Sequence, residues 1–473
     1  MMMRSALSPE LGEVQEELKR ITVGWASHHR LDEARAATLR RRAAELCHQH
    51  YYAAIPYYRR VAERMDTSAH APLEQIVERM LVPDDIFKSY PARLLDEGRW
   101  AEMTQWISRI SAYELSVDTA DVETIDDWIA KLAEAGLRLV FSSGTSGQLS
   151  FVPRDERTWR AFTELPFLHV AAHLADRGVL PAWKRTALRL AADHLAPADY
   201  ASLVQRYGLR GLEGFFFNFS GGNQGVQLVG QELGRLTKAA CFLYEKKMSA
   251  AAVRAIVRGP RSPREQALVD ELLDTTVRQK TANYDRVLRA LSRAAERRQR
   301  VVIFGTPALM MELLEEVQRR GLSLALPQGS TISYGGGWKS FTGARVPEAE
   351  LVRRLTTTFG VAPAAISEGY SMTEINGLFP RCAQGRFHVP PFLEAVIYAE
   401  DLSLRQGPEV RGTLGVLDPF ATSYPGFVLT GDNVSLSRAP CPCGLAGPSI
   451  LRVERSPGKD VKGCGGIMAA VNA

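Results

Sequence analysis

Leu139-Val-Phe-Ser-Ser-Gly-Thr-Ser-Gly-Gln-Leu-Ser-Phe-Val-Pro153 is the stretch of sequence that decides the fold class. The largely apolar run from Leu137 to Phe141 predicts a short buried strand. Only small hydroxylated residues and glycines follow it, namely Ser142, Ser143, Gly144, Thr145, Ser146 and Gly147. Glycines let a backbone approach a ligand closely, and hydroxyls beside exposed backbone N–H groups form a nest of donors for an anion. We therefore predict a loop that binds polyphosphate, with a flexible serine–glycine linker as the alternative. It is not a Walker loop, because no Gly-Lys-Ser/Thr follows.

Segments with helical and extended patterns alternate after this loop, up to about residue 380. The extended patterns lie at residues 186–191, 301–305 and 330–334, and the helical ones at 158–177, 264–298 and 308–320. Such alternation is typical of an α/β domain with a mostly parallel sheet, in which ligands bind at the carboxyl ends of the strands. We predict this α/β core over residues 131–380.

The residue patterns on both sides of this core differ from those within it. Residues 1–130 are predicted to be mainly helical, interrupted by extended, aromatic segments such as Ile55-Pro-Tyr-Tyr58. Residues 381–455 contain short β-rich runs separated by glycine and proline, which predict a small antiparallel β subdomain. We expect residues 456–473, which are glycine-rich and contain Cys464, to form a flexible tail.

The composition excludes several classes of protein. The chain has 473 residues, of which 45% are hydrophobic and 23% charged, as in ordinary globular proteins. Its net charge of +5 is small, and its basic runs carry alanines and glutamates, so we interpret them as solvated helix faces and expect no nucleic acid partner. No apolar run reaches the roughly 18 residues of a membrane span, and the N-terminus lacks the apolar core of a signal peptide. Six cysteines in so long a chain are not a disulfide scaffold, so we expect a reducing, cytoplasmic setting.

A second group of polar residues follows Ile366: Glu368, Gly369, Tyr370, Ser371, Thr373 and Glu374. Tyr370 could stack on a planar base, Thr373 could contact a phosphate, and Glu374 could ligate a divalent cation. An ordinary polar loop explains these residues equally well when they are taken alone. Asp432, in Leu429-Thr-Gly-Asp432, is predicted to lie on a tight turn after a strand. There its carboxylate either accepts hydrogen bonds from the two hydroxyls of a ribose or only caps the turn.

A third group has the spacing of metal ligands, and its members are Cys382, His388, Cys441 and Cys443. Three thiolates and one imidazole complete the tetrahedral shell of a structural zinc ion and leave no open position for catalysis. The alternative is that three buried free cysteines and a polar histidine occur there without a metal. We favour the zinc site.

Taken in order, these motifs resemble those of the adenylate-forming superfamily, which includes the acyl-CoA ligases and the adenylation domains of peptide synthetases. The resemblance rests on the serine-rich loop, Gly335-Gly-Gly337, Tyr370-Ser-Met-Thr-Glu374 and Thr430-Gly-Asp432, and it covers roughly residues 130–465. The cysteine–histidine group looks like the metal site of members similar to phenylacetate–CoA ligase. Three further segments resemble the acyl-protein synthetase family of bacterial bioluminescence: Val82–Lys88, Gly335–Lys339 and Lys462–Cys464.

The resemblance implies a large N-terminal-type domain that activates a carboxylic acid with ATP, giving acyl-AMP and pyrophosphate, and then transfers the acyl group to a thiol. The loop Ser142–Gly147 would hold the departing phosphates, Thr373 would bind the α-phosphate, and Glu374 would bind Mg²⁺. Asp432 would bind the ribose. The adenine would be framed by Gly335, Gly336, Gly337 and Tyr370, within a cofactor-binding set that also includes Glu368, Gly369 and Ser371.

The chain departs from the superfamily in two respects. Only 41 residues follow Asp432, so we expect the usual C-terminal domain and its catalytic lysine to be absent. The serine-rich loop also lacks the lysine common in the superfamily, and the first cation after it is Arg154. Lys339, Lys459 and Lys462 are the candidates for the missing positive charge.

The acyl acceptor and the acid stay open at this point. In the family that it resembles, the acyl group moves to a cysteine near the C-terminus, and Cys464 lies in a matching place beside two lysines that would lower its thiol pKa. The alternatives are an unreactive thiol in a free-standing ligase, which would make a thioester of CoA or of an acyl-carrier protein, and a non-catalytic nucleotide-binding subunit. A reductase is a further possible partner. The segment Phe215–Phe219 could line a pocket for the small carboxylic acid or belong to the core, and we favour the core.

Overall fold

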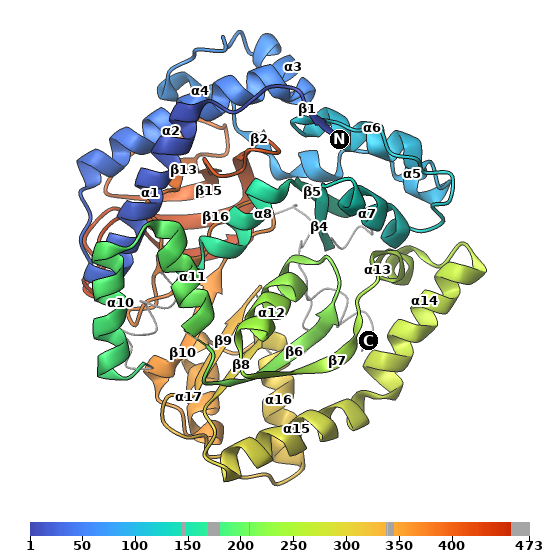
Figure 1. Ribbon diagram of the computed structural model, residues 1–473, viewed down its shortest axis with the longest axis vertical. Helices are drawn as coiled ribbons and strands as arrows, with labels where there is room; N and C mark the ends of the chain where they lie inside the picture. Colours follow the sequence, from blue (N-terminus) through green and yellow to red (C-terminus); the bar gives the residue numbers. More distant parts are fainter. Residues whose placement is uncertain (144–147, 169–179, 208, 337, 339–344, 456–473) are drawn as a thin grey trace.

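The computed structural model describes residues 1–143, 148–168, 180–207, 209–336, 338 and 345–455 (Figure 1). The N-terminal region is helical, as predicted, and its helices are α1 (Pro9–His28), α2 (Glu33–Ala54), α3 (Pro56–Arg64), α4 (Leu73–Arg79), α5 (Ala92–Asp96), α6 (Trp100–Ile110) and α7 (Ile125–Glu134). The prediction that Ile55–Tyr58 is extended was wrong, because Pro56 begins α3. Proline suits the first helical position, where its missing N–H would have no partner within the helix.

A six-stranded sheet forms the α/β core. Its strands are β6 (Glu213–Gly221), β7 (Ala239–Lys247), β8 (Val301–Gly305), β9 (Thr331–Gly335), β10 (Ile366–Tyr370) and β11 (Phe379–Pro380), and they lie in the order β11-β10-β9-β8-β6-β7. All neighbours are parallel except β10 and β11. The prediction of a mostly parallel sheet is therefore confirmed for this part of the chain.

The helices of this part either precede β6 or connect the strands, and the connecting helices cover both faces of the sheet (Figure 1). They are α8 (Glu156–Glu164), α10 (Ala182–His194), α11 (Pro197–Tyr207), α12 (Gly225–Leu236), α13 (Ala250–Arg258), α14 (Pro263–Leu273), α15 (Lys280–Glu296), α16 (Pro307–Arg319) and α17 (Glu348–Phe359). The strand predicted at residues 186–191 was wrong, since these residues lie inside α10. Their alternation of apolar and polar residues is weak, and the helix propensity of the alanines, leucines and arginines prevails over it.

The direction of the chain across the six-stranded sheet reverses between β6 and β8. From β6 the chain passes through α12 to β7 on one side, whereas from β8 it passes through α16 to β9 and then through α17 to β10 on the other side. Right-handed crossovers in opposite directions place α12 on one face and α16 on the other (Figure 1). A crevice outside the carboxyl ends of the strands opens at such a reversal, and it is where ligands bind in open α/β sheets.

The predicted strand before the serine-rich loop is present, but it does not join the parallel sheet. Strand β4 (Arg138–Ser143) pairs with β5 (Leu149–Arg154) as a two-stranded antiparallel hairpin. The hairpin reaches the large sheet through Phe141, whose N–H donates to the carbonyl of Asn223 at 2.8 Å, just beyond the end of β6. The start of the serine-rich loop therefore lies next to the reversal point.

The third part is a seven-stranded, mainly antiparallel sheet. Its strands are β12 (Phe387–His388), β13 (Glu394–Tyr398), β14 (Leu404–Arg405), β15 (Glu409–Leu417), β16 (Phe427–Ser437), β17 (Ser449–Arg455) and the short β2 (Val82–Pro83) from the N-terminal region, which pairs parallel to β16. The antiparallel β region predicted after residue 381 is thus present, with a strand from the N-terminal region added to it. Two more short strands, β1 (Met2–Met3) and β3 (Tyr113–Glu114), pair separately.

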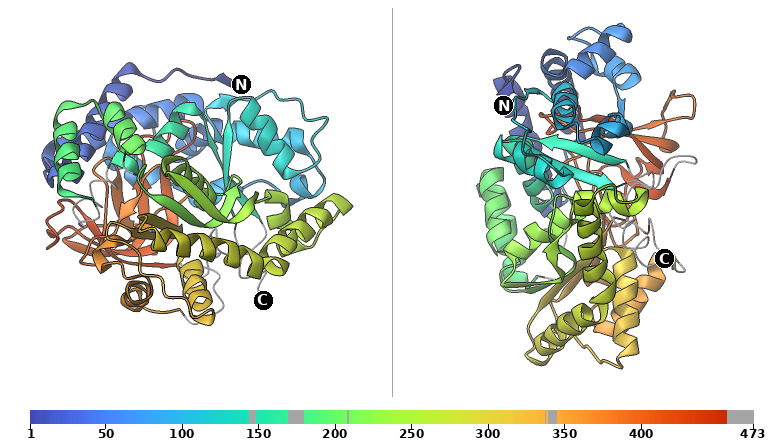
Figure 2. Two further views of the ribbon diagram at one scale, coloured as in Figure 1. Left: turned by 60° about the horizontal axis from the view of Figure 1, so that its bottom comes forward. Right: turned by 90° about the vertical axis from the view of Figure 1, so that its right-hand side faces the viewer.

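Helices α1 and α2 pack against the seven-stranded sheet, and α5, α6 and α7 lie beside the β4–β5 hairpin (Figure 1). The six-stranded sheet and its helices form the other half of the molecule (Figures 1 and 2). The hydroxyl of Tyr51 on α2 donates to the carbonyl of Ala421 at 2.8 Å, and its ring lies 5.1 Å from that of Phe427. A single cluster of buried apolar residues extends from Leu11 to Ile450 and joins all three parts. Within the described ranges, no helix combines the length and the apolar character needed to cross a membrane.

Candidate functional site

Two glycines form the floor of the site at the carboxyl ends of β9 and β10. Gly335 and Gly369 are directly opposite each other in the parallel pair. A Cβ atom at Gly335 would lie 2.9 Å from the carbonyl oxygen of Gly369, so a side chain would force the strands apart. Gly336, the next residue, has a φ of +86°, which favours glycine. The chain turns at Gly336, just beyond the end of β9, and the backbones of the two strands approach each other closely at Gly335 and Gly369. Gly337 and Lys339 lie outside the described residues.

Tyr370 ends β10 and points its hydroxyl toward Asp432. The phenol donates to Oδ2 of Asp432 at 2.8 Å. The tyrosine ring packs between two other aromatic rings, with centroid distances of 5.3 Å to Phe379 and 5.9 Å to Phe387. This contact joins the carboxyl edge of the six-stranded sheet to the seven-stranded sheet.

The prediction that Asp432 lies on a tight turn was wrong, because β16 continues through it. The register between β15 and β16 shifts here: Thr413 faces Asn433, but Gly415 faces Leu429. One residue of β15 thus opposes three residues of β16, so that Asp432 sits in a β-bulge. Bulges change the direction in which a side chain points, and they occur often beside active sites.

Thr373 and Glu374 lie on the turn that follows β10. A Cβ atom at Gly225, the first residue of α12, would lie 3.2 Å from the hydroxyl of Thr373, so this turn touches the loop after β6. The hydroxyl of Ser371 donates to the carbonyl of Gly377 at 2.9 Å and closes the loop behind the turn. Glu374 is buried.

The serine-rich loop begins at the same place. Ser142 is buried and lies opposite Ser150 in the hairpin, and the preceding residue, Phe141, contacts the loop after β6. That loop continues into Gly225, where an added Cβ atom would meet the hydroxyl of Thr373. Besides Gly337 and Lys339, the predicted site residues outside the described part of the chain are Gly144, Thr145, Ser146, Gly147, Lys459 and Cys464, and Lys462 lies there too.

Glu368, predicted as part of the cofactor-binding set, forms an ion pair in the structure. Arg381 donates to its carboxylate at 2.5 Å and also contacts Glu348 at 2.7 Å. Burial raises the pKa of Glu368, although Arg381 acts in the opposite direction. This ion pair connects β10 to the segment after β11. Glu368 therefore lies next to the site, but its carboxylate is already paired with Arg381.

Sequence reasoning missed three buried residues beneath the Thr373–Glu374 turn, namely Arg154, Asp418 and Tyr424. Each is almost fully enclosed by the protein, and Arg154 and Tyr424 form hydrogen bonds to the backbone of the turn. The available signal was a charged residue, Arg154, at the end of the apolar segment Leu149–Pro153. The segment Phe215–Phe219 lies in β6, where its phenylalanines are buried, as the core interpretation expects. Phe216, Phe217 and Phe219 also pack on other aromatic rings.

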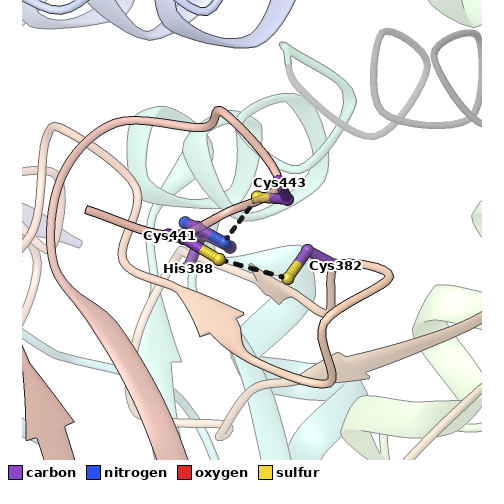
Figure 3. Close-up of side chains that lie close together, drawn as sticks. All are labelled: Cys382, His388, Cys441 and Cys443. Carbon is purple, nitrogen blue, oxygen red and sulfur yellow. Dashed lines mark hydrogen bonds between the residues drawn. The ribbon is translucent and has the colours of Figure 1, made fainter. Parts of the chain in front are cut away.

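The four predicted metal ligands come together at one point between the two large sheets (Figure 3). Cys382 follows β11, His388 ends β12, and the two remaining cysteines lie in the turn between β16 and β17. Their ligand atoms all lie within 4.8 Å of one another. The Sγ atoms of Cys382 and Cys441 are 3.8 Å apart, and Sγ of Cys443 is 3.3 Å from Nε2 of His388.

These separations fit a tetrahedral metal shell. Zn–S bonds of about 2.3 Å at tetrahedral angles place two sulfurs roughly 3.8 Å apart, and a Zn–N bond of about 2.0 Å gives a slightly shorter S–N edge. Burial opposes ionisation of Cys382, but hydrogen bonds from His388 and from the backbone of Arg386 and Gln384 outweigh it and lower the pKa of this thiol. Burial raises the pKa of Cys443 to about 12. A cation bound among these groups would stabilise all three thiolates.

The comparison with protein families covers the C-terminal part of the chain. Residues 275–471 match the family model described as acyl-protein synthetase, LuxE. A long-chain-fatty-acid–luciferin-component ligase from Aliivibrio fischeri is 26% identical over 209 residues, which are 43% of this chain. The chain spans 55% of the length of that relative.

Two solved structures illustrate the structural comparison. A 2-hydroxyisobutyryl-CoA ligase in complex with 2-HIB-AMP and CoA is 15% identical, with a TM-score of 0.49, and the match covers 91% of this chain and 70% of that one. ATP-bound MatB from Rhodopseudomonas palustris is 14% identical, with a TM-score of 0.32, over 66% of this chain and 47% of that one.

The matched region of the family model contains the Thr373–Glu374 turn, Asp432 and all four residues of the cysteine–histidine cluster. The predicted resemblance is therefore confirmed for this region: over residues 275–471 the chain is similar to the acyl-protein synthetases.

Proposed function

We propose that this chain activates a carboxylic acid with ATP, forming an acyl-adenylate and pyrophosphate, and then passes the acyl group to a thiol, which releases AMP. The observation that carries the proposal is the convergence of four separate segments on one edge of the six-stranded sheet. These segments are the start of the serine-rich loop, the glycines at the end of β9, the Tyr370–Glu374 segment and the bulge at Asp432. The similarity of residues 275–471 to acyl-protein synthetases supports the same chemistry.

The nucleotide would lie across this edge. In the proposed arrangement Gly335 and Gly336 offer a flat floor to the adenine, and Tyr370 borders it. Asp432 accepts hydrogen bonds from the ribose hydroxyls, while its second partner, the phenol of Tyr370, fixes its orientation. The loop Ser142–Gly147 would then hold the phosphates, because it starts beside the Thr373 turn.

The chemical step needs positioning and neutralisation of charge rather than a nucleophile from the protein. A carboxylate oxygen of the acid attacks the α-phosphorus, the bond to the β-phosphate breaks, and pyrophosphate leaves. Thr373 would donate to the α-phosphate, and Glu374 would hold Mg²⁺, which offsets the charge of the phosphate oxygens. Lys339, Lys459 and Lys462 are the candidates for an additional cation at the reacting centre.

We further propose that the cysteine–histidine cluster holds a structural zinc ion. The distances between the ligand atoms support this identity, as does the set of three thiols and one imidazole. Such a metal would join the segment after β11 to the β16–β17 turn. It would also hold the end of α1, where Nε1 of Trp25 donates to the carbonyl of Ala446 at 2.7 Å.

A long-chain fatty acid is the first acid to test, because the Aliivibrio fischeri relative is a long-chain-fatty-acid–luciferin-component ligase. The test is exchange of radiolabelled pyrophosphate into ATP in the presence of hexadecanoate, followed by a panel of shorter and aromatic acids. Exchange that depends on the added acid would support the proposal. No exchange with any acid in the panel would contradict it and would favour a non-catalytic nucleotide-binding subunit.

The acceptor requires a separate experiment. Incubation of the protein with ATP and labelled acid should leave label on the denatured chain if Cys464 is acylated, and Cys464→Ser should abolish that label. If the label never stays on the chain, and thioester forms only after CoA or an acyl-carrier protein is added, the acceptor is that external thiol instead.

A further inference from the structure

Arg154 ends strand β5, and its side chain is completely buried. Among the described residues, no carboxylate forms an ion pair with it, and its Nε and Nη1 atoms have no hydrogen-bond partner. Its guanidinium carbon lies 4.3 Å from the ring centroid of Phe162 and 5.3 Å from that of Tyr424. Burying a charge with so few polar partners is unfavourable, so folding stability alone does not explain an arginine here.

The one nitrogen of Arg154 that has partners is directed at the backbone of the Thr373–Glu374 turn. Nη2 donates to the carbonyl of Thr373 at 2.6 Å and contacts the carbonyl of Ile375 at 3.5 Å. It also donates to the hydroxyl of Tyr424 at 3.2 Å, and that hydroxyl donates to the carbonyl of Glu374 at 3.2 Å. Arg154 thus reaches three consecutive carbonyls of this turn, two directly and one through Tyr424.

A second buried group holds the far end of the same turn. The carboxylate of Asp418 accepts from the backbone N–H of Asn376 at 2.6 Å and from its side-chain amide at 3.0 Å. The backbone N–H of Phe420 donates to the other oxygen of Asp418 at 2.9 Å. The carbonyl side of the turn therefore faces a cation, and the N–H groups after it face an anion. Both charged groups lie beneath the turn and not on the surface.

We infer that Arg154 is a positioning residue, which fixes the Thr373–Glu374 turn so that the threonine hydroxyl and the glutamate carboxylate are held ready for the phosphates and their metal ion. This inference rests on the proposed function. Arg154 acts through the backbone of the turn, and its positive charge also attracts the carboxylates of Asp418 and Glu374. Partners behind the ligands of a metal ion commonly change its affinity by about 10- to 100-fold when they are removed.

The test compares two variants with the wild-type protein. Arg154→Met removes the charge and the donors but fills the space, and Arg154→Lys keeps the charge with a donor that cannot reach all three carbonyls. The measurements are the unfolding temperature, the affinity for ATP as a function of Mg²⁺ concentration, and pyrophosphate exchange with hexadecanoate. Arg40→Lys is the matched control. Arg40 on α2 is also buried, but it pairs with Glu33 of the same helix and with Glu394 of β13.

We expect Arg154→Met to keep or raise the unfolding temperature while the Mg²⁺ concentration needed for half-maximal ATP binding rises about 10-fold or more. Arg154→Lys should show a smaller shift of the same kind, and Arg40→Lys should show none. If both Arg154 variants bind Mg²⁺ and ATP as the wild type does, the inference is overturned. Failure of both variants to fold would also overturn it, because Arg154 would then be a residue that only stabilises the fold.

The wild-type measurement separates this inference from the function on which it rests. A wild-type protein that binds no ATP at any Mg²⁺ concentration would contradict the proposed function itself. A wild-type protein that binds ATP with Mg²⁺, together with unchanged Arg154 variants, would contradict only the role of Arg154.

Discussion

The phenol of Tyr370 donates a hydrogen bond of 2.8 Å to Oδ2 of Asp432, and this bond connects the end of β10 to the bulge in β16. The two residues belong to different sheets and are 62 positions apart in the sequence. Because each residue constrains the other, the carboxylate reaches the site in one orientation. In the proposed function, that orientation is the one that meets a ribose.

Tyr370→Phe tests this relationship. The substitution keeps the ring that packs on Phe379 and Phe387 and removes only the donor to Asp432. A hydrogen bond to a charged group contributes roughly 1.5 to 3 kcal/mol, so ATP should bind about 10-fold more weakly or worse. Calorimetric titration with ATP measures the change. Tyr398→Phe is the control, because the hydroxyl of Tyr398 donates to the carbonyl of Val77 and not to Asp432. Equal affinities of the wild type and both variants for ATP would contradict the prediction.

Gly225→Ala should separate activity from stability. The new methyl group would lie 3.2 Å from the hydroxyl of Thr373, and this close contact displaces the threonine by a few tenths of an ångström. Alanine also favours the first turn of α12 over glycine, by up to about 1 kcal/mol. We expect slower pyrophosphate exchange, by roughly 10-fold, together with an unchanged or higher unfolding temperature.

Gly24→Ala is the control for Gly225→Ala. Gly24 lies in α1, and a Cβ atom there would have no neighbour within 4 Å. This variant should be stabilised and should exchange pyrophosphate at the wild-type rate. If Gly225→Ala also exchanges at the wild-type rate, the contact between α12 and the Thr373 turn has no part in the activity.

The sequence predicts those features that depend on local patterns. The strands at residues 301–305 and 330–334 are found within one residue as β8 and β9, because buried parallel strands are short apolar runs bounded by turns. The meeting of Cys382, His388, Cys441 and Cys443 at one point could also be predicted, because their residue types and spacing are typical of metal ligands. The local pattern was misleading at residues 186–191. A short alternation of apolar and polar residues there predicted a strand, but these residues lie within α10.

Features that depend on pairing between distant segments could not be predicted. Nothing near Phe141 indicates that its strand forms a hairpin with β5 instead of joining the parallel sheet. The bulge at Asp432 arises from the register of β15 against β16, which single residues do not encode. Arg154 looks like an ordinary charged residue after an apolar segment until Thr373, far away in the sequence, is placed over it.

The stability of the N-terminal helices should fall in mildly acidic solution because of His48. This histidine is fully buried, and its two ring nitrogens contact the hydroxyl of Tyr58 and the carbonyl of Ser68, each at 2.8 Å. Burial lowers its pKa below 6.5, so the unfolded chain binds more protons than the folded one as the pH falls below 6.5. Stability is therefore fully present above pH 6.5 and is lost as the pH falls toward the folded-state pKa.

Denaturant unfolding of wild-type protein and His48→Gln between pH 5 and about 7.5 measures this effect. The variant should be less stable at the upper end of the range, because it loses buried hydrogen bonds, but its stability should fall less steeply with decreasing pH. His50, whose pKa burial also lowers, leaves part of the slope in place. His194→Gln, at an exposed position, serves as the control, and an identical slope in His48→Gln would contradict the prediction.

Cys441→Ser should remove the proposed zinc ion and loosen both segments that the cluster joins. A hydroxyl replaces one of three thiolates, and zinc binds the remaining incomplete shell far more weakly. Purified wild-type protein should contain about one zinc ion per chain, and the variant close to none, by elemental analysis. The unfolding temperature should fall with the zinc content, and chelation of the wild type should lower that temperature to the same value.

Cys241→Ala changes a cysteine outside the cluster and should affect neither measurement. A wild-type protein that is free of metal yet unfolds at the same temperature before and after zinc is added would show that the four side chains meet without a metal ion.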